Sequence, residues 1–217
     1  MTVQALELTV TAPVVSFRNP LYAGVQVGLP CPPPATVGGM LAAAAGGWAQ
    51  VDPRMRFAMA FRARGQGVDL ETYHPLEATG KKADPTPRER AFLADVRLTV
   101  WVLDDPAVWM QRMRRPRWPL RLGRSQDLVG LASLHLVRLQ DTPGRQGGAV
   151  VPADLTSIGT LLRLPTAVSE DRGHTRWDAY RFAARHDADQ PIGWSDGQGR
   201  AVVALPPTHP AGTRNRR

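Results

Sequence analysis

The chain has 217 residues, of which 43% are hydrophobic and 21% charged, and its formal net charge at pH 7 is +8. A chain of this length and composition buries a substantial core without disulfides or metal staples, which excludes a disordered protein and a cysteine-rich scaffold. The basic excess favours an anionic partner such as nucleic acid, although a GC-rich genome would produce the same surplus of arginine.

The sequence also constrains the compartment in which the protein works. Its sole cysteine, Cys31, cannot form an internal disulfide, which indicates a reducing environment. No stretch of about 18 uncharged apolar residues and no signal-peptide pattern is present, so we expect a cytoplasmic protein without membrane contact. No histidine or carboxylate cluster has metal-ligand spacing, and neither a metal nor another cofactor is expected.

The first quarter of the chain predicts two strands flanking a helix. Apolar and polar residues alternate over 5–17, which is typical of a strand with one buried face. Prolines and glycines interrupt residues 18–34 and predict a loop. Thr36 then offers an N-cap hydroxyl to an alanine-rich helix that ends at Gly46. Alternation returns near 57–64 and predicts the second strand.

The next part of the chain predicts a long insertion followed by a strand, a helix and another strand. Residues 65–90 are polar and broken by glycine and proline, and we interpret them as an inserted basic hairpin. Residues 96–102 alternate as a third strand, and Pro106 begins a helix that reaches Arg114. A glycine turn then precedes a fourth strand that ends at Leu139.

The order of these elements predicts the fold class. The pattern β-α-β-β-α-β over residues 1–140 indicates an α+β, ferredoxin-like (RRM-like) domain, in which both helices cover one face of an antiparallel four-stranded sheet. Residues 141–207 contain short apolar stretches between polar turns and predict a smaller, mostly β C-terminal domain. Residues 208–217 are predicted to form a disordered tail.

Catalytic motifs are scarce in the sequence. It has no phosphate-binding loop, nucleophile elbow or zinc-protease motif. One arrangement suits metal-independent RNA cleavage: Tyr73 or His74 deprotonates a 2′-hydroxyl while Lys81 or Lys82 stabilises the transition state. The alternative is a solvated hairpin that only touches phosphates, or touches nothing.

The exposed face of the predicted sheet suits contacts to phosphates better than base stacking. An RNA recognition motif stacks bases on two or three aromatic residues of its sheet, whereas only Trp101 would be available here. Arg62, Arg64 and Arg97 accompany it on neighbouring positions. We therefore expect RNA to be held by loops and arginines, unless this surface is simply solvated or contacts a protein.

Three segments together resemble a known family. Residues 16–18 end the first strand and are followed by the proline- and glycine-rich run 29–41. Residues 90–96 lead into the third strand, and residues 122–128 form the glycine turn before the fourth strand. In this order, the segments resemble the CRISPR-associated family-five proteins, which are RAMP-superfamily subunits of type I Cascade complexes. The resemblance covers residues 5 to about 140.

The resemblance implies a non-catalytic RNA-binding subunit that holds the 5′ handle of the CRISPR RNA and caps the backbone filament in antiviral defence. Its implied partners are the backbone RAMP subunit, the large subunit and, through the complex, target DNA. One branch of the family cleaves precursor RNA with tyrosine, lysine and histidine, so a metal-independent endoribonuclease is the alternative. A third hypothesis is a protein-interaction module whose charge reflects genome composition.

Two pairs of residues near the first helix are candidates for holding the handle. Arg18 and Asn19 leave the sheet into the following loop, where a guanidinium can grip a phosphate and an amide can read a base edge. Gly38 and Gly39 are placed in the first helical turn, whose free N–H groups form an anion site. Close packing of the helix is the alternative reason for these glycines.

Two further pairs lie on turns. Arg124 and Ser125 follow a glycine that can adopt positive φ and would project donors beside the loop after the first strand, or would form a structural turn. Lys81 and Lys82 at the hairpin tip would act as a thumb over the RNA, or remain in a solvated loop. The predicted RNA-binding set is therefore Arg18, Asn19, Gly38, Gly39, Arg62, Arg64, Lys81, Lys82, Arg124 and Ser125.

Overall fold

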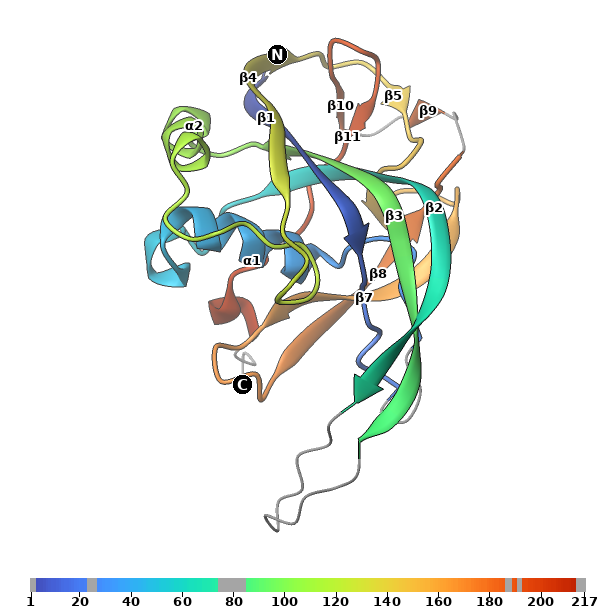
Figure 1. Ribbon diagram of the computed structural model, residues 1–217. Helices are drawn as coiled ribbons and strands as arrows, with labels where there is room; N and C mark the ends of the chain where they lie inside the picture. The colour runs from blue at the N-terminus through green and yellow to red at the C-terminus, as the bar shows by residue number, and fades with distance from the viewer. Residues whose placement is uncertain (1–2, 23–26, 74–84, 186–188, 191–192, 214–217) are drawn as a thin grey trace.

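Figure 1 shows the computed structural model, which describes residues 3–22, 27–73, 85–185, 189–190 and 193–213. Strand is the predominant regular structure, and the main sheet has four strands in the order β2-β3-β1-β4, with every neighbouring pair antiparallel. The elements that form this sheet and its helices are β1 (Val3–Val15), α1 (Pro34–Ala45), the short 3₁₀ helix η1 (Trp48–Gln50), β2 (Phe57–Tyr73), β3 (Thr86–Val102), α2 (Pro106–Arg114) and β4 (Gly130–Leu139).

The C-terminal part of the chain contains short strands and one larger unit, the three-stranded sheet β6-β8-β7. Two small pairs, β5-β9 and β10-β11, accompany it. None of the described helices has the length and apolar character needed to cross a membrane. The elements are β5 (Gly144–Arg145), β6 (Val150–Pro152), β7 (Thr160–Val168), β8 (Thr175–Phe182), β9 (Asp189–Gln190), β10 (Trp194–Ser195), β11 (Ala201–Val202) and the 3₁₀ helix η2 (Pro210–Thr213).

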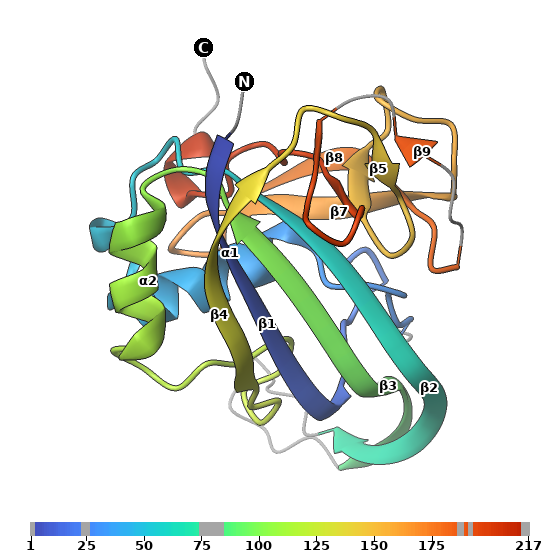
Figure 2. The same ribbon diagram turned by 90° about the horizontal axis from the view of Figure 1, so that it is seen from above.

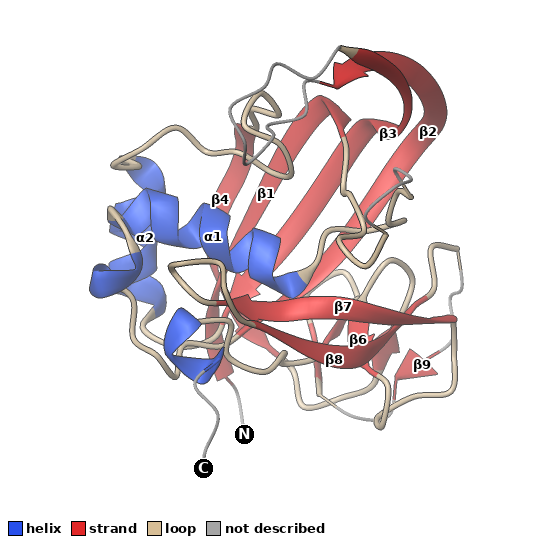
Figure 3. Cartoon of the chain, turned by 90° about the horizontal axis from the view of Figure 1, so that it is seen from below, coloured by secondary structure: helices blue, strands red, loops and turns tan. Residues whose placement is uncertain are grey.

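One face of the main sheet carries the principal core. Leu6, Leu8 and Val10 on β1 are buried and alternate with more polar neighbours, as the period of a strand requires. Figure 3 shows α1, α2 and the sheet of β6, β7 and β8 on this same side, and α1, β7 and β8 can also be followed behind the main sheet in Figure 2. Leu164 and Tyr180 from that C-terminal sheet belong to the same hydrophobic cluster as β1. The C-terminal sheet therefore shares the main core.

The start of α1 differs from the sequence prediction. The helix begins at Pro34, with Pro33 as N-cap and no side-chain cap, because proline fits the first helical turn without losing a hydrogen bond. Thr36 is consequently inside the helix. Gly38 and Gly39 lie in the second turn, where their N–H groups can bond within the helix. The predicted stop at Gly46 is confirmed by its φ of 94°.

The predicted insertion at 65–90 is largely a continuation of two core strands. β2 and β3 keep one register from Phe57 opposite Val102 to Tyr73 opposite Thr86, with the ladder interrupted only at Arg64 and Asp95. Antiparallel hydrogen bonds maintain this ribbon even where its side chains are exposed, as Leu70 is at 74%. Both strands are therefore much longer than the segments that alternation in the sequence identified.

The prediction of a disordered tail is wrong for residues 208–213. Thr208 is 1% exposed, and Pro210 is buried at the start of η2. The His209 ring packs edge to face on Trp48 with ring centroids 5.3 Å apart, and its Nε2 lies 3.1 Å from the Trp48 carbonyl oxygen. These contacts attach the end of the described chain to the segment after α1.

Candidate nucleic-acid interface

A buried carboxylate fixes the glycine turn (residues 122–128) to the end of β1. Asp127 is 6% exposed, and its Oδ2 accepts hydrogen bonds from the backbone N–H groups of Ser16, at 3.0 Å, and Arg124, at 2.9 Å. Gly123 adopts a φ of +111°, and a Cβ there would lie 2.7 Å from the Ser16 carbonyl oxygen. The turn therefore lies beside the loop after β1, as the sequence predicted.

Arg124 joins this turn to the β2–β3 ribbon. Its Nη2 donates to Glu71 on β2, while its Nη1 is buried without a hydrogen-bond partner among the described residues. On the same ribbon, Arg90 forms an ion pair with Asp69, and its hydrogen bonds hold the pKa of that carboxyl below its usual value. Arg124 is thus part of a charged network, and its Nη1 has no hydrogen-bond acceptor among the described residues.

Arg18 and Asn19 lie directly after the segment that contacts the glycine turn. Arg18 is exposed and pairs through its backbone with Gly28 across the loop. The Asn19 side chain accepts a hydrogen bond of 3.1 Å from the Leu21 N–H, and the Asn19 N–H donates to the Val27 carbonyl at 2.8 Å. Asn19 therefore shapes the loop, while Arg18 extends from it.

The two helix glycines have different surroundings. Gly38 is buried, and a Cβ there would overlap Thr208 and lie 3.2 Å from the Trp48 ring. Gly39 faces open space and lines a cleft together with Gly123. The predicted anion site in the first helical turn is wrong, because both glycines lie one turn further on. Close packing accounts for Gly38, and access to the cleft distinguishes Gly39.

Arg62 and Arg64 are separate from this group. Both are exposed on β2, and Arg62 lies opposite Arg97 in the sheet register, on the face away from the main core. Arg64 forms an exposed ion pair with Asp95 at 3.2 Å. The structure therefore divides the predicted basic residues between the glycine-turn end and the outer face of the sheet.

The predicted exposure of Trp101 on that outer face is wrong. Trp101 is 0% exposed and donates its indole N–H to Glu7 at 2.9 Å. The guanidinium of Arg200, which arrives from the turn between β10 and β11, covers the ring and donates to Glu7 at 2.9 Å. An aromatic platform for bases is therefore absent from this part of the described sheet.

Several predicted residues add little to this geometry. Ser125 is exposed on the glycine turn beside Arg124. The Tyr73 side chain, together with His74, Lys81 and Lys82, lies outside the described residues. The thumb and the cleavage site proposed for these residues consequently stay predictions.

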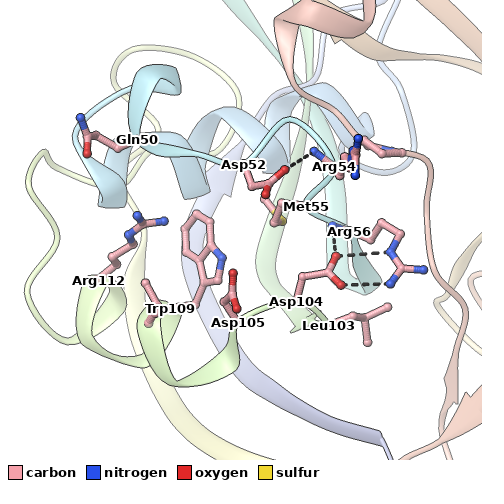
Figure 4. Close-up of a pocket in the computed structure, with 12 residues that line it drawn as sticks. Gln50, Asp52, Arg54, Met55, Arg56, Leu103, Asp104, Asp105, Trp109 and Arg112 are labelled. Carbon is pink, nitrogen blue, oxygen red and sulfur yellow. Dashed lines mark hydrogen bonds and ion pairs between the residues drawn. The ribbon is translucent and has the colours of Figure 1, made fainter.

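A charged cleft lies between α2 and the segment that precedes β2 (Figure 4). Arg56 binds Asp104 through two side-chain hydrogen bonds of 3.3 Å and 3.0 Å. The guanidinium carbon of Arg112 lies 4.8 Å from the centroid of the Trp109 ring. Acidic and basic groups are therefore mixed here, and no metal-ligating cluster occurs among the described parts of the chain.

Comparison with known proteins identifies the family. The model of the CRISPR-associated protein family Cas_Cas5 matches residues 5–193 of this sequence. The chain belongs to the Cas5 family of CRISPR-associated proteins. This assignment confirms the resemblance seen in the three sequence segments and extends it over most of the C-terminal region. None of the curated proteins matches the sequence.

Two solved structures share the fold of this Cas5 chain. One is a chain of a "CRISPR RNA-guided surveillance complex", with a TM-score of 0.60 and 17% identity over 96% of this chain and 97% of that one. The other is a CRISPR protein from Archaeoglobus fulgidus, with a TM-score of 0.54 and 13% identity over 94% of this chain and 100% of that one. The similarity extends over nearly the entire length of each.

Several residues that shape the surfaces of this Cas5 chain could not be identified from its sequence. Arg200 and Thr208 lie beyond the matched family region, and both are far from their contacts in sequence. Glu71 is one of several charged residues in the segment that the sequence analysis interpreted as a polar insertion, and no pattern distinguishes it from them. Asp127 carried the best available signal, because an aspartate after a glycine turn often accepts backbone hydrogen bonds.

Proposed function

We propose that this protein is a non-catalytic RNA-binding subunit of a type I Cascade complex, in which it holds the 5′ handle of the CRISPR RNA and caps the backbone filament. The partners in this proposal are the CRISPR RNA, the backbone RAMP subunit, the large subunit and, through the complex, target DNA. Family membership supports the CRISPR setting. The similarity in fold to a chain of an RNA-guided surveillance complex is consistent with it.

The observation that carries the proposal is the attachment of the glycine turn to the end of β1. Asp127 holds the turn so that Arg124 and Ser125 lie beside the strand end from which Arg18 emerges. Arginines on fixed backbone lose little freedom when they bind a phosphate, and their charged hydrogen bonds are strong. The same turn contacts the β2–β3 ribbon through the ion pair of Arg124 with Glu71. The proposal adds Lys81 and Lys82 from the sequence that joins these two strands.

We also propose that the unit from β1 to β4 is ferredoxin-like. The element order β1-α1-β2-β3-α2-β4 and the sheet order β2-β3-β1-β4 support this assignment. In such a fold the sheet face opposite the helices often binds RNA. Here Arg200 covers Trp101 on that face, which favours the glycine-turn end as the binding surface.

The direct test is binding of the full chain to its cognate repeat RNA. Arg124→Ala should weaken binding by about 1–3 kcal/mol, because it removes charge-assisted hydrogen bonds. Glu71→Ala is the matched control, since it breaks the same ion pair but keeps the cation. We expect Glu71→Ala to retain or increase affinity, and equal losses in both variants would show that Arg124 only anchors the ribbon.

Salt dependence measures the number of phosphates held. If Arg18, Arg124, Lys81 and Lys82 contact phosphates, log K should fall with log salt with a slope of roughly −3, from about −0.7 per neutralised phosphate, and a contribution from Arg64 on the outer face would steepen it. A slope near zero would exclude these residues as phosphate contacts. Co-purification with the operon partners, followed by sequencing of bound RNA, identifies the RNA itself.

The proposal that the subunit does no chemistry has its own test. The purified chain should leave its repeat RNA intact in EDTA at pH 7–8, and His74→Ala should alter binding at most. Site-specific cleavage that His74→Ala abolishes while binding survives would establish the endoribonuclease alternative, because loss of a general base slows such a reaction by orders of magnitude.

A further inference from the structure

A groove runs along the exposed side of α1, and we call it the tryptophan groove. It consists of two adjoining cavities of about 450 Å³ and 530 Å³, which share Ala35, Gly39 and Trp118. The floor at Gly39 is open, since no atom lies within 4 Å of where its Cβ would be. One cavity reaches Gly123 of the glycine turn, and the other reaches Thr208 near the C-terminus.

Trp118 lines both cavities of this groove with an exposed aromatic ring. Its side chain is 52% exposed, which is unusual for a residue of its size and hydrophobicity. Its backbone N–H donates to the Ala43 carbonyl at 3.2 Å, near the C-terminus of α1. A Cβ at Gly47 would lie 3.4 Å from the far edge of the indole, so the ring packs against that glycine. One edge of the indole therefore lies near Gly47, while about half of the residue remains exposed to a ligand.

The rim of the tryptophan groove is basic. Arg121 lines one cavity and Arg172 the other, and Arg117 precedes the tryptophan. All three are exposed, and within the described parts of the chain none of their guanidinium groups forms an ion pair. The acidic side chain that lines the groove is Glu170. An aromatic ring with an unpaired arginine in each adjoining cavity is complementary to a nucleotide, which has a flat base and an anionic phosphate.

Thr208 closes the end of the groove nearest the C-terminus. It is 1% exposed, and its hydroxyl has no hydrogen-bond partner among the described residues. This hydroxyl lies against α1, since a Cβ at Gly38 would overlap its oxygen. Thr208 therefore forms part of the wall, and the indole and the arginines are the groups that a ligand can reach.

We propose that the tryptophan groove binds one unpaired nucleotide of single-stranded RNA, with its base stacked on Trp118 and its phosphates near Arg121 and Arg172. The inference rests on the proposed function, because it adds a base-binding site to the surface that holds the RNA. An apolar protein partner is the competing occupant. The basic rim favours RNA, since burial of unpaired arginines under an apolar surface is costly.

The test uses the full chain and an eight-nucleotide oligoadenylate RNA with 2-aminopurine at one position. Binding should quench the 2-aminopurine fluorescence when this base stacks on the indole. Trp118→Leu keeps an apolar side chain but cannot stack, and should weaken binding about fivefold to a hundredfold and remove the quenching. Trp118→Tyr should retain most of both signals. Leu161→Ala, an exposed apolar residue of β7 outside the groove, is the control and should change neither.

The results of this test distinguish failure of the nucleotide site from failure of the proposed RNA-binding function. If the wild-type chain binds the oligonucleotide and Trp118→Leu binds equally well, the groove does not hold a nucleotide, while the proposed RNA-binding function stands. Loss of copurifying Cascade subunits in that variant would then assign the groove to a protein partner. If the wild-type chain binds neither this RNA nor its repeat RNA, the proposed function and the nucleotide site are both excluded.

Discussion

The guanidinium of Arg200 lies over the indole of Trp101, with its carbon 4.9 Å from the ring centroid. The same guanidinium donates to Asp196 at 2.6 Å, to Glu7 at 2.9 Å and to the Thr99 hydroxyl at 3.2 Å. One side chain from the C-terminal region thus satisfies two carboxylates and covers an aromatic ring on the outer face of the main sheet.

Removal of Arg200 should destabilise the fold substantially. The side chains of Asp196 and Glu7 are only 1% and 14% exposed, so Arg200→Ala leaves poorly hydrated carboxylates without their cation. We expect a loss of about 3 kcal/mol in the free energy of unfolding, measured by urea denaturation. Arg138→Ala, an exposed arginine on β4, should change this free energy by less than about 0.5 kcal/mol. Equal losses in the free energy of unfolding of the two variants would show that the contacts of Arg200 do not stabilise the fold.

The two glycines of α1 should respond to alanine in opposite ways. A Cβ at position 38 would lie 2.9 Å from the Thr208 Cβ and closer still to its hydroxyl, so Gly38→Ala should cost about 1–3 kcal/mol through overpacking. Gly39→Ala meets no atom within 4 Å and should gain up to about 1 kcal/mol from helix propensity. Melting temperatures compare the two directly, and a stabilised Gly38→Ala variant would show that the 208–213 segment moves freely.

Truncation should separate the packed C-terminal segment from the residues beyond it. A chain ending at Pro207 loses the contacts of Thr208 and His209 with α1 and Trp48, and should melt several degrees lower. A chain ending at Thr213 keeps all of these contacts and should melt like the full chain. Identical melting of both truncations would contradict the packing role of residues 208–213.

Acid should weaken the ion pair of the charged cleft. Burial alone would raise the pKa of Asp104, but the hydrogen bonds and charge of Arg56 outweigh it and lower the pKa below its ordinary value of 3.8. Because the folded pKa is the lower one, the stabilisation is present above pH 3.8 and is lost as pH falls through the folded value.

The variant Asp104→Asn tests this dependence. It should lower the free energy of unfolding by about 1 kcal/mol at pH 7, a modest figure because both side chains are partly exposed. The difference from the wild type should shrink below pH 3.8. Asp154→Asn, which removes an exposed carboxylate, is the control for the change in net charge. A difference that stays constant down to pH 2 would mean that the ion pair contributes nothing.

The sequence predicted the strand faces and turns that depend on residues close together in the chain. Alternation identified the core of β1 at Leu6 and Leu8, and the glycine turn was placed correctly beside the end of this strand. Alternation could not show how far β2 and β3 continue, because exposed ribbon residues such as Leu70 carry no burial signal. The buried face of β1 was predictable from the local pattern, whereas the length of the ribbon was not.

Contacts between distant segments account for the other differences. Trp101 alternates like an exposed strand residue, and it is buried because Arg200 and the apolar residues Val202 and Trp194 of the C-terminal region cover the outer face. Residues 208–213 look like a polar tail, and their order depends on the space that Gly38 leaves for Thr208. In both cases the partner lies in another part of the fold, where no periodicity in the local sequence can reveal it.

The separation of 193 residues between Glu7 and Arg200 sets an order of events during synthesis. Strands β1 and β3 can pair before the C-terminal region exists, but the outer face cannot close until Arg200 has been made. At about 5–20 residues per second, roughly a hundred residues take some 5–20 s to add after Trp101. For that interval the nascent chain exposes an indole and an unpaired carboxylate, so closure of the outer face must be one of its last folding steps.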